Sequence, residues 1–321
     1  MAAARSLLLL SSLLALAACG GDGPDSPEQR GLTRVVVIPK GTTHQFWQSV
    51  NDGAQAAALA HQLDVTFKGP LQENDRVQQK QLVQQFLAEG VAGIALAPLD
   101  HKALVPEVQR ATKQGVPVVI FDSSLDAEVG EDFATFVATD NRKGGRMAGE
   151  EMARLVGEGG KVVMLRYQVG SASTTAREEG FLEAAKENGL IVTIENRYAG
   201  ATTGEAKTAA LNLADDLRAA DGVFCPCEPV TMGVMLALDQ LEMPGKLKFV
   251  GFDVTAPLKK GLWTGKIHAL VVQNPRQMGW LAVESLKTLI GGGKVEPYQD
   301  TGCVLATKAN MNEPKVAPLL K

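Results

Sequence analysis

The sequence is poor in the residues from which metal sites and covalent cross-links are built. It contains four histidines and four cysteines among its 321 residues. No two histidines lie within one helical turn of each other and no CxxC pair occurs, which argues against a zinc site, a haem site and a disulfide scaffold. Cys225 and Cys227 are too close for an unstrained disulfide, so they are predicted to be free, buried thiols, and Cys303 has no expected partner. We therefore expect neither a metal nor a cofactor.

The chain also lacks an excess of basic residues. Its 32 Lys and Arg against 36 Asp and Glu give a net charge of −4. Without a basic surplus to neutralise phosphates, the chain is not expected to bind nucleic acid. Hydrophobic residues make up 45% and charged residues 21% of the sequence, which suits a sizeable core in one large or two ordinary domains.

The first 19 residues differ from the rest of the chain. A positive charge at Arg5 precedes a short apolar stretch that ends in the sequence LAAC at Cys19. The stretch is too short to span a bilayer, and its ending resembles a bacterial lipobox, a signal that is cut before a cysteine that then carries lipid. We interpret residues 1–19 as a lipoprotein signal peptide with lipidation on Cys19, and the polar residues 20–31 as a flexible tether. The alternative is an ordinary cleavable signal with an incidental cysteine.

Beyond the tether, short β-branched runs alternate with segments of helical apolar spacing. Strands are expected at 34–38, 65–67, 93–96, 116–121 and 133–138, and, after a restart near Lys143, at 161–165, 191–195, 222–224, 246–252 and 267–272. Alternating units of this kind predict parallel sheets with helices on both faces. Two successive series predict an α/β fold of two doubly wound lobes, which bind ligands beyond the carboxyl ends of their strands.

Polar and aromatic residues stand where several of these strands end. The set comprises Lys40, His44, Phe46, Trp47, Asp122, Arg177, Cys227, Glu228, Asp253 and Gln273. Sugars need such a mixture, because the C–H faces of their rings pack on aromatic planes. Their hydroxyls both donate and accept, so carboxylates, amides and Arg satisfy them in pairs.

The sequence resembles the periplasmic-binding-protein type I sugar receptors of ABC importers, the ribose-, galactose- and xylose-binding kind. The resemblance rests on segments 44–55 (HQFWQSVNDGAQ), 97–100 (APLD), 118–122 (VVIFD), 138–145 (ATDNRKGG), 176–181 (AREEGF), 250–253 (VGFD) and 273–275 (QNP), in that order. It implies a first lobe of residues 32–139 and 274–298 and a second lobe of residues 140–273 and 299–321, joined by three crossings. It also implies a small-molecule sugar as ligand, a membrane ABC permease as partner and a location in the periplasm or at the cell surface.

On this resemblance, the family's ligand-binding positions can be placed residue by residue. In the first lobe, the first-loop polar group falls on His44, the stacking aromatics fall on Phe46 and Trp47, and the carboxylate after the fourth strand falls on Asp122. In the second lobe, the arginine falls on Arg177, and the hinge-side Asp and Gln fall on Asp253 and Gln273. Three positions depart: Ala97 and Ser123 replace an Asn and an Arg, and Cys227, followed by Glu228, replaces an Asn. These departures argue against ribose itself, and Lys40 is an additional pocket group that would favour an acidic or differently substituted sugar.

Five of these candidates have a purely structural alternative. Phe46 and Trp47 can be core residues, since aromatics at a helix start often are. Asp122 and Asp253 can be helix N-caps, because each ends an apolar strand before a turn. Arg177 can be a solvated helix charge.

Two alternative functions share parts of this pattern. A receptor that reports its ligand to a chemoreceptor or histidine kinase would have the same fold and site. A secreted glycoside hydrolase would need two carboxyl groups about 5–5.5 Å apart, a role for Asp122 and Asp253. No Gly-x-Ser-x-Gly elbow is present. A binding protein rather than an enzyme is the main expectation.

Overall fold

The computed structural model describes residues 31–321, and Thr33–Lys321 form one compact unit. The predicted signal peptide, its lipidated Cys19 and residues 20–30 of the tether lie outside the described residues. Among residues 31–321, no helix is both long and apolar enough to cross a membrane.

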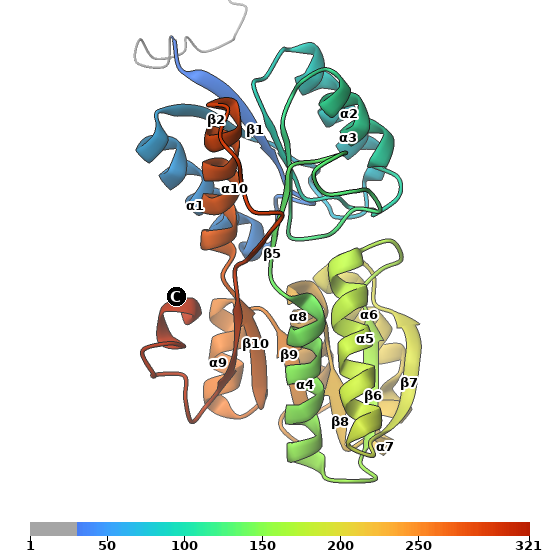
Figure 1. Cartoon of the computed structure of the whole chain (residues 1–321). Helices are drawn as coiled ribbons and strands as arrows, with labels where there is room; N and C mark the ends of the chain where they lie inside the picture. The colour runs from blue at the N-terminus through green and yellow to red at the C-terminus, as the bar shows by residue number, and fades with distance from the viewer. Residues whose placement is uncertain (1–30) are drawn as a thin grey trace, which may run out of the picture. The chain divides into compact units, whose positions relative to one another are not determined.

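The first of two six-stranded sheets has the strand order β11-β5-β4-β3-β1-β2, with every pair parallel. Its strands are β1 (Thr33–Ile38), β2 (Leu63–Phe67), β3 (Ile94–Leu96), β4 (Val118–Phe121), β5 (Thr135–Ala138) and β11 (Tyr298–Asp300). Its helices are α1 (Gln45–His61), α2 (Arg76–Ala88), α3 (Val105–Lys113) and α10 (Pro275–Ile290). Side chains alternate along β1, so Val35 and Val37 pack with α1 and α10, whereas Val36 and Ile38 pack with α2 and α3. Figure 1 shows α1 and α10 lying against each other.

The second sheet has the order β12-β10-β9-β8-β6-β7 and is parallel except for β12, which pairs antiparallel with β10. Its strands are β6 (Lys161–Arg166), β7 (Ile191–Tyr198), β8 (Gly222–Phe224), β9 (Lys248–Phe252), β10 (Ala269–Gln273) and β12 (Cys303–Thr307). Its helices are α4 (Asn141–Val156), α5 (Ala172–Glu187), α6 (Thr203–Asn212), α7 (Ala214–Ala219), α8 (Glu228–Gln240), α9 (Ala256–Thr264) and the 3-10 helix η1 (Ala317–Leu320). Helices α4 and α5 pack on one face, and α6, α8 and α9 on the other.

Each strand expected from the sequence is present, and two α/β lobes with helices on both faces result. Helix α5 begins at Ala172, within a stretch rich in Ser and Thr. Ser and Thr in this stretch favour a loop on propensity alone. The Thr175 N–H nevertheless donates to the Ser171 carbonyl, which closes a first helical turn in which Ser173 and Thr174 are buried.

Three connections join the sheets. They follow β5 near Thr139, follow β10 at Asn274, and lie between β11 and β12 at residues 301–302. The third lies slightly beyond the expected boundary at 298, because Tyr298–Asp300 still pair with β5. The strands β11 and β12 were not expected from the sequence.

Helices α4 and α5 cross almost backbone to backbone. A Cβ atom on Gly145 would lie 2.0 Å from the Arg177 carbonyl oxygen, and one on Gly180 would lie 2.1 Å from that of Arg142. Only glycine permits this approach. The crossing therefore fixes the position of Arg177, one of the candidate binding residues.

Candidate functional site

A cavity lies between the lobes, where the carboxyl ends of the parallel strands of both sheets meet. Its lining comprises Lys40, His44, Phe46, Trp47, Glu73, Asp122, Tyr167, Ser173, Thr174, Arg177, Cys227, Glu228, Pro229, Asp253 and Gln273. All ten candidates from residues 40–273 are brought together here. The sequence interpretation missed the lining residues Glu73, Tyr167, Ser173, Thr174 and Pro229.

Two carboxylates stand directly after strands in an uncommon backbone conformation. Asp122 follows β4 with φ of 60°, and Asp253 follows β9 with φ of 67°. Asp visits this left-handed region more readily than most residues, yet such positions are strained and gather at functional sites. Neither residue is the N-cap of the helix that follows it: Thr255 caps α9, and β5 is the next element after Asp122. The alternative that each carboxylate caps the helix after its own strand is therefore wrong for both.

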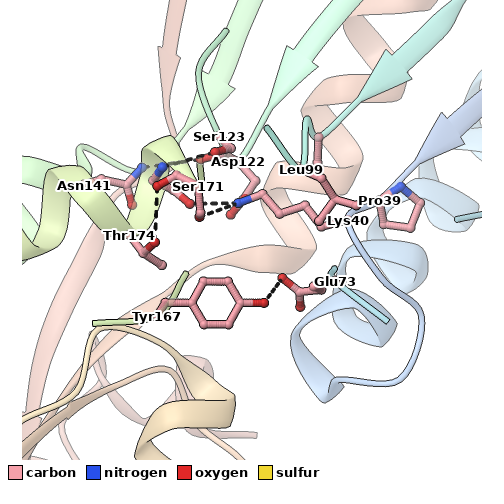
Figure 2. Close-up of polar contacts among 12 residues, drawn as sticks. Pro39, Lys40, Glu73, Leu99, Asp122, Ser123, Asn141, Tyr167, Ser171 and Thr174 are labelled. Atoms are coloured by element: carbon pink, nitrogen blue, oxygen red, sulfur yellow. Dashed lines mark hydrogen bonds and ion pairs between the residues drawn. The ribbon is translucent and has the colours of Figure 1, made fainter. Parts of the chain in front are cut away.

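Lys40 and Asp122 form a buried ion pair, with 3.0 Å between Nζ and Oδ2. The same ammonium donates to Ser173 Oγ at 3.0 Å and to Ser171 Oγ at 3.4 Å, at the start of α5 in the other lobe. Figure 2 shows Lys40 extended towards Asp122 and Ser171. An ammonium group has three donors, and these three acceptors use them all. An acidic ligand therefore finds no unused Lys40 donor in this arrangement.

Glu73, in the loop between β2 and α2, accepts three side-chain hydrogen bonds. His44 Nδ1 lies 2.5 Å and Trp47 Nε1 lies 2.7 Å from its Oε1. From the second lobe, the Tyr167 hydroxyl donates to its Oε2 at 2.9 Å, as Figure 2 shows. Burial raises the pKa of Glu73, but the hydrogen bond and charge of His44, the charge of Lys40 and the Trp47 hydrogen bond outweigh burial and hold this pKa below its usual value. Burial lowers the pKa of His44, but its hydrogen bond to Glu73 and the charges of Glu73, Glu228 and Asp253 outweigh that effect and hold the pKa above its usual value.

Asp253 organises a second polar group beside the hinge. It accepts the Gln273 Nε2–H at 2.7 Å and the Glu228 backbone N–H at 2.9 Å. Burial raises the pKa of Asp253, and these bonds, with Arg177, oppose the rise. Because the Gln273 amide nitrogen faces this carboxylate, its Oε1 points elsewhere. That oxygen is buried without a hydrogen-bond partner among the described residues. It is an acceptor that a ligand hydroxyl would satisfy.

Glu228 reaches across the cavity from the first turn of α8. Its carboxylate accepts the backbone N–H groups of Gln45 at 3.1 Å and Phe46 at 2.9 Å, at the start of α1 in the first lobe. His44 is the N-cap of α1 but makes no side-chain capping bond, so Glu228 supplies the missing acceptors. Burial raises the pKa of Glu228 to about 7, in spite of these bonds.

Arg177 is buried, with 2% of its surface exposed, so it is not a solvated helix charge. Its Nε donates to Asn141 Oδ1 at 2.8 Å and its Nη1 to the Pro226 carbonyl at 3.0 Å. The guanidinium carbon lies 4.3 Å from the centroid of the Phe252 ring. A guanidinium has five N–H donors, so Arg177 retains donors for a ligand.

The sequence profile of the family described as periplasmic binding protein domain matches residues 35–294. The chain belongs to this family. Its members are substrate-binding proteins of transporters and not enzymes, so the expected role of a binding protein is confirmed. The expected periplasmic-binding-protein type I fold, with two α/β lobes, is confirmed as well.

Curated and solved relatives cover nearly the whole chain. The ribose import binding protein of Bacillus subtilis is 30% identical over 302 residues, 92% of this chain and 96% of the relative. An ABC transporter solute-binding protein from Agrobacterium vitis with bound D-fucose is 35% identical with a TM-score of 0.83, and covers 90% of this chain and 100% of its own. A carbohydrate transporter solute-binding protein from Agrobacterium radiobacter, in complex with D-arabinose, is 31% identical with a TM-score of 0.85, and covers 91% and 99%.

The two aromatic candidates of this binding protein differ in burial. Trp47 is 3% exposed, belongs to the core beneath α1 and α10, and also lines the cavity. Phe46 is partly buried and meets the Trp47 ring edge to face, with 4.9 Å between centroids. Trp47 is therefore fixed by its packing and by Glu73, whereas Phe46 offers the more accessible ring.

The cysteines and the acidic residues form no further chemical centre in residues 31–321. Cys225, Cys227 and Cys303 are free there, and burial raises the pKa values of Cys225 and Cys227 well above their usual range. Such thiols are weak nucleophiles. No group of three metal-ligating side chains is found among the described residues.

Proposed function

We propose that this protein captures a neutral sugar between its lobes outside the cytoplasm and delivers it to a membrane ABC importer. The observation that carries the proposal is the cavity lining, which takes carboxylates, an arginine, an amide and aromatic rings from both lobes. Relatives named for ribose, D-fucose and D-arabinose support the ligand class.

We propose that the ligand contacts come from Asp122 in the first lobe and from Arg177, Asp253 and Gln273 in the second. Gln273 Oε1 offers an unused acceptor, and Arg177 retains unused donors. A hydroxyl-rich ligand can satisfy both kinds of group at once. Among the other candidates, Phe46 and Trp47 provide the apolar contact, and Lys40, His44, Cys227 and Glu228 shape the site around it.

We also propose that lipid on Cys19 anchors the protein to a bacterial membrane, so that the receptor stays close to its permease. The support is the LAAC sequence at Cys19 and the polar residues that follow. In cells that express the chain, Cys19→Ser should move the protein from the membrane fraction to the soluble extracytoplasmic fraction. Mass spectrometry of the wild-type N-terminal peptide should find a diacyl modification, and an unmodified peptide at this position would contradict the anchor.

A thermal-shift screen of the purified protein against a library of pentoses, hexoses, deoxy sugars and sugar acids tests the main proposal. A ligand at 100 times its Kd should raise the free energy of unfolding by about 2.7 kcal/mol. We expect one or a few neutral sugars to do so, and the sugar acids not to. Asp122→Ala serves as the matched control that should lose the shift. The proposal is wrong if no sugar stabilises the wild type, or if sugars stabilise both proteins equally.

A further inference from the structure

The second-lobe segment that follows β6 is held by the first lobe along its whole length. The Tyr167 hydroxyl donates to Glu73 Oε2, and Gln168 Nε2 donates to the Glu73 carbonyl at 2.6 Å. Arg76 donates to the Val169 carbonyl, and the His101 N–H donates to the Gly170 carbonyl at 3.1 Å. Every one of these bonds joins the two lobes, and none of them needs a ligand atom.

The bond between Tyr167 and Glu73 is more buried than the bond between Arg76 and Val169. Tyr167 is 1% exposed and Glu73 is 7% exposed, whereas the Arg76 side chain is 41% exposed. Exposed polar contacts such as that of Arg76 exchange readily with water and contribute little to the stability of the closed arrangement. A buried hydrogen bond to an ionised carboxylate is stronger than a neutral one and is shielded from competing water. The Tyr167–Glu73 bond is therefore the main polar contact of this segment.

The carboxylate partner is itself held in place. His44 and Trp47 both bond to Glu73 Oε1, which leaves Oε2 aimed at the second lobe. Because the first lobe alone supplies these two partners, Glu73 is prearranged whether or not the lobes are closed. When the lobes separate, the Glu73 carboxylate loses only its bond to Tyr167 and keeps its bonds to His44 and Trp47.

We propose that Tyr167 and Glu73 form a ligand-independent latch that stabilises the closed arrangement of the lobes. The proposal rests on the proposed function, because a latch of this kind sets how much of the free receptor is ready to hold a sugar. The apparent affinity of a binding protein is reduced by the fraction of molecules that are not in the competent state. The latch thus adjusts affinity for every ligand by one common factor, whereas a direct ligand contact discriminates between sugars.

Tyr167→Phe tests the latch, because it removes one hydroxyl and keeps the buried ring. Tyr198→Phe is the matched control: Tyr198 lies on β7 of the same lobe, is 47% exposed, and its hydroxyl makes no hydrogen bond among the described residues. Fluorophores can be attached through non-natural amino acids at Leu59 on α1 and Asp215 on α7, two highly exposed positions in different lobes. Single-molecule energy transfer then gives the ratio of closed to open molecules without ligand.

In the full-length protein, Tyr167→Phe should lower the closed-to-open ratio of the free receptor about tenfold, the effect of one hydrogen bond to a charged group. It should raise Kd for every bound sugar by one common factor of up to the same size, and Tyr198→Phe should change neither quantity. An unchanged ratio together with unchanged Kd values overturns the latch. So does a change in Kd that differs from sugar to sugar, which would make Tyr167 a ligand contact. If no sugar binds at all, the proposed function fails, and the ratio in the free protein still decides the latch.

Discussion

Lys40 and Asp122 form a buried ion pair whose cation also reaches the opposite lobe. Asp122 Oδ2 accepts from Nζ at 3.0 Å, and the two other donors of Lys40 meet Ser171 and Ser173. Asp122 is thus neutralised within its own lobe before a ligand arrives. Its Oδ1 accepts no hydrogen bond from the described residues, which leaves this oxygen for a ligand hydroxyl. The pair is the reason that we propose a neutral sugar as ligand in place of the acidic sugar that Lys40 alone suggested.

Asp122→Ala is expected to abolish tight binding and ligand-induced compaction together. A ligand that bonds Asp122 and Arg177 at once can do so only when the lobes are closed, so it shifts the population towards the closed form. Without Asp122, one lobe loses its hold on the ligand. Calorimetry gives the affinity, and small-angle scattering with and without ligand gives the radius of gyration.

Two further variants make this experiment specific. Asp122→Ala leaves a buried Lys40 unpaired, which can cost about 3–5 kcal/mol of stability. Asp122→Asn keeps the shape and should also lose affinity while remaining folded. Asp216→Ala, an exposed second-lobe acid, should change nothing. The closure mechanism fails if saturating ligand leaves the radius of gyration of the wild-type protein unchanged.

Phe46→Ala is expected to weaken sugar binding by about 1–3 kcal/mol while the fold remains intact, because a partly buried ring lost from the cavity removes an apolar contact. Trp47→Ala should weaken binding to a similar degree, but it also empties a core position and can cost about 3–5 kcal/mol of stability. Affinity by calorimetry and unfolding by denaturant separate the two effects.

Phe136→Ala is the control, since Phe136 is a partly buried first-lobe residue outside the cavity. It should lower stability and leave affinity unchanged; equal affinity in the Phe46 variant and the wild type would place Phe46 outside the binding site.

The position of several site residues follows from the sequence through one rule of parallel sheets. Asp122, Asp253 and Gln273 lie at the ends of β4, β9 and β10, and carboxyl ends of parallel strands meet at one edge. Tyr167 directly follows β6, so the same rule could have found it. The left-handed backbone of Asp122 and Asp253 and the partners of their carboxylates could not be predicted, because they depend on contacts between segments that are distant in the sequence.

Glu73 could not be predicted in the same way. It lies six residues beyond the end of β2 in a turn-rich segment without apolar periodicity, where a single Glu looks like a solvated charge. Its importance comes from contacts with His44, Trp47 and Tyr167, which the fold brings together from two lobes. Similarly, the three acceptors of Lys40 come from β4 and from the start of α5. Side chains that act across the lobe boundary are set by the closed geometry, which local sequence patterns do not encode.

Gly145→Ala is expected to weaken sugar binding from outside the cavity. The added Cβ would lie 2.0 Å from the Arg177 carbonyl oxygen, so α5 must shift away from α4 and carry Arg177 with it. Denaturant unfolding should show lower stability, and calorimetry should show lower affinity.

Gly204→Ala is the matched control, since Gly204 lies in α6 with nothing within 4 Å of its Cβ position. It should leave affinity unchanged and raise stability by up to about 1 kcal/mol. Wild-type affinity in the Gly145 variant would show that Arg177 tolerates displacement and does not bind the ligand tightly.

Glu178 gives the protein a measurable pH dependence of stability. Burial raises its pKa to about 7, and the Tyr167 N–H and the charge of Arg166 only partly oppose this. In the unfolded chain its pKa is about 4.5. The folded state therefore binds more protons between these two values, and the free energy of unfolding contributed by Glu178 falls as the pH rises from about 4.5 to 7 and is constant above.

Glu178→Gln should remove this part of the pH dependence, because the amide keeps an acceptor for the Tyr167 N–H and carries no charge at any pH. Relative to the wild type, the variant should gain up to about 3 kcal/mol of stability between pH 5 and pH 8, the equivalent of a shift of about 2.5 pH units. Chemical denaturation at a series of pH values measures the difference. Glu179→Gln, at the exposed neighbouring position, should follow the wild-type profile. Parallel profiles for wild type and Glu178→Gln would mean that Glu178 is ionised in the folded protein at the same pH as in the unfolded chain.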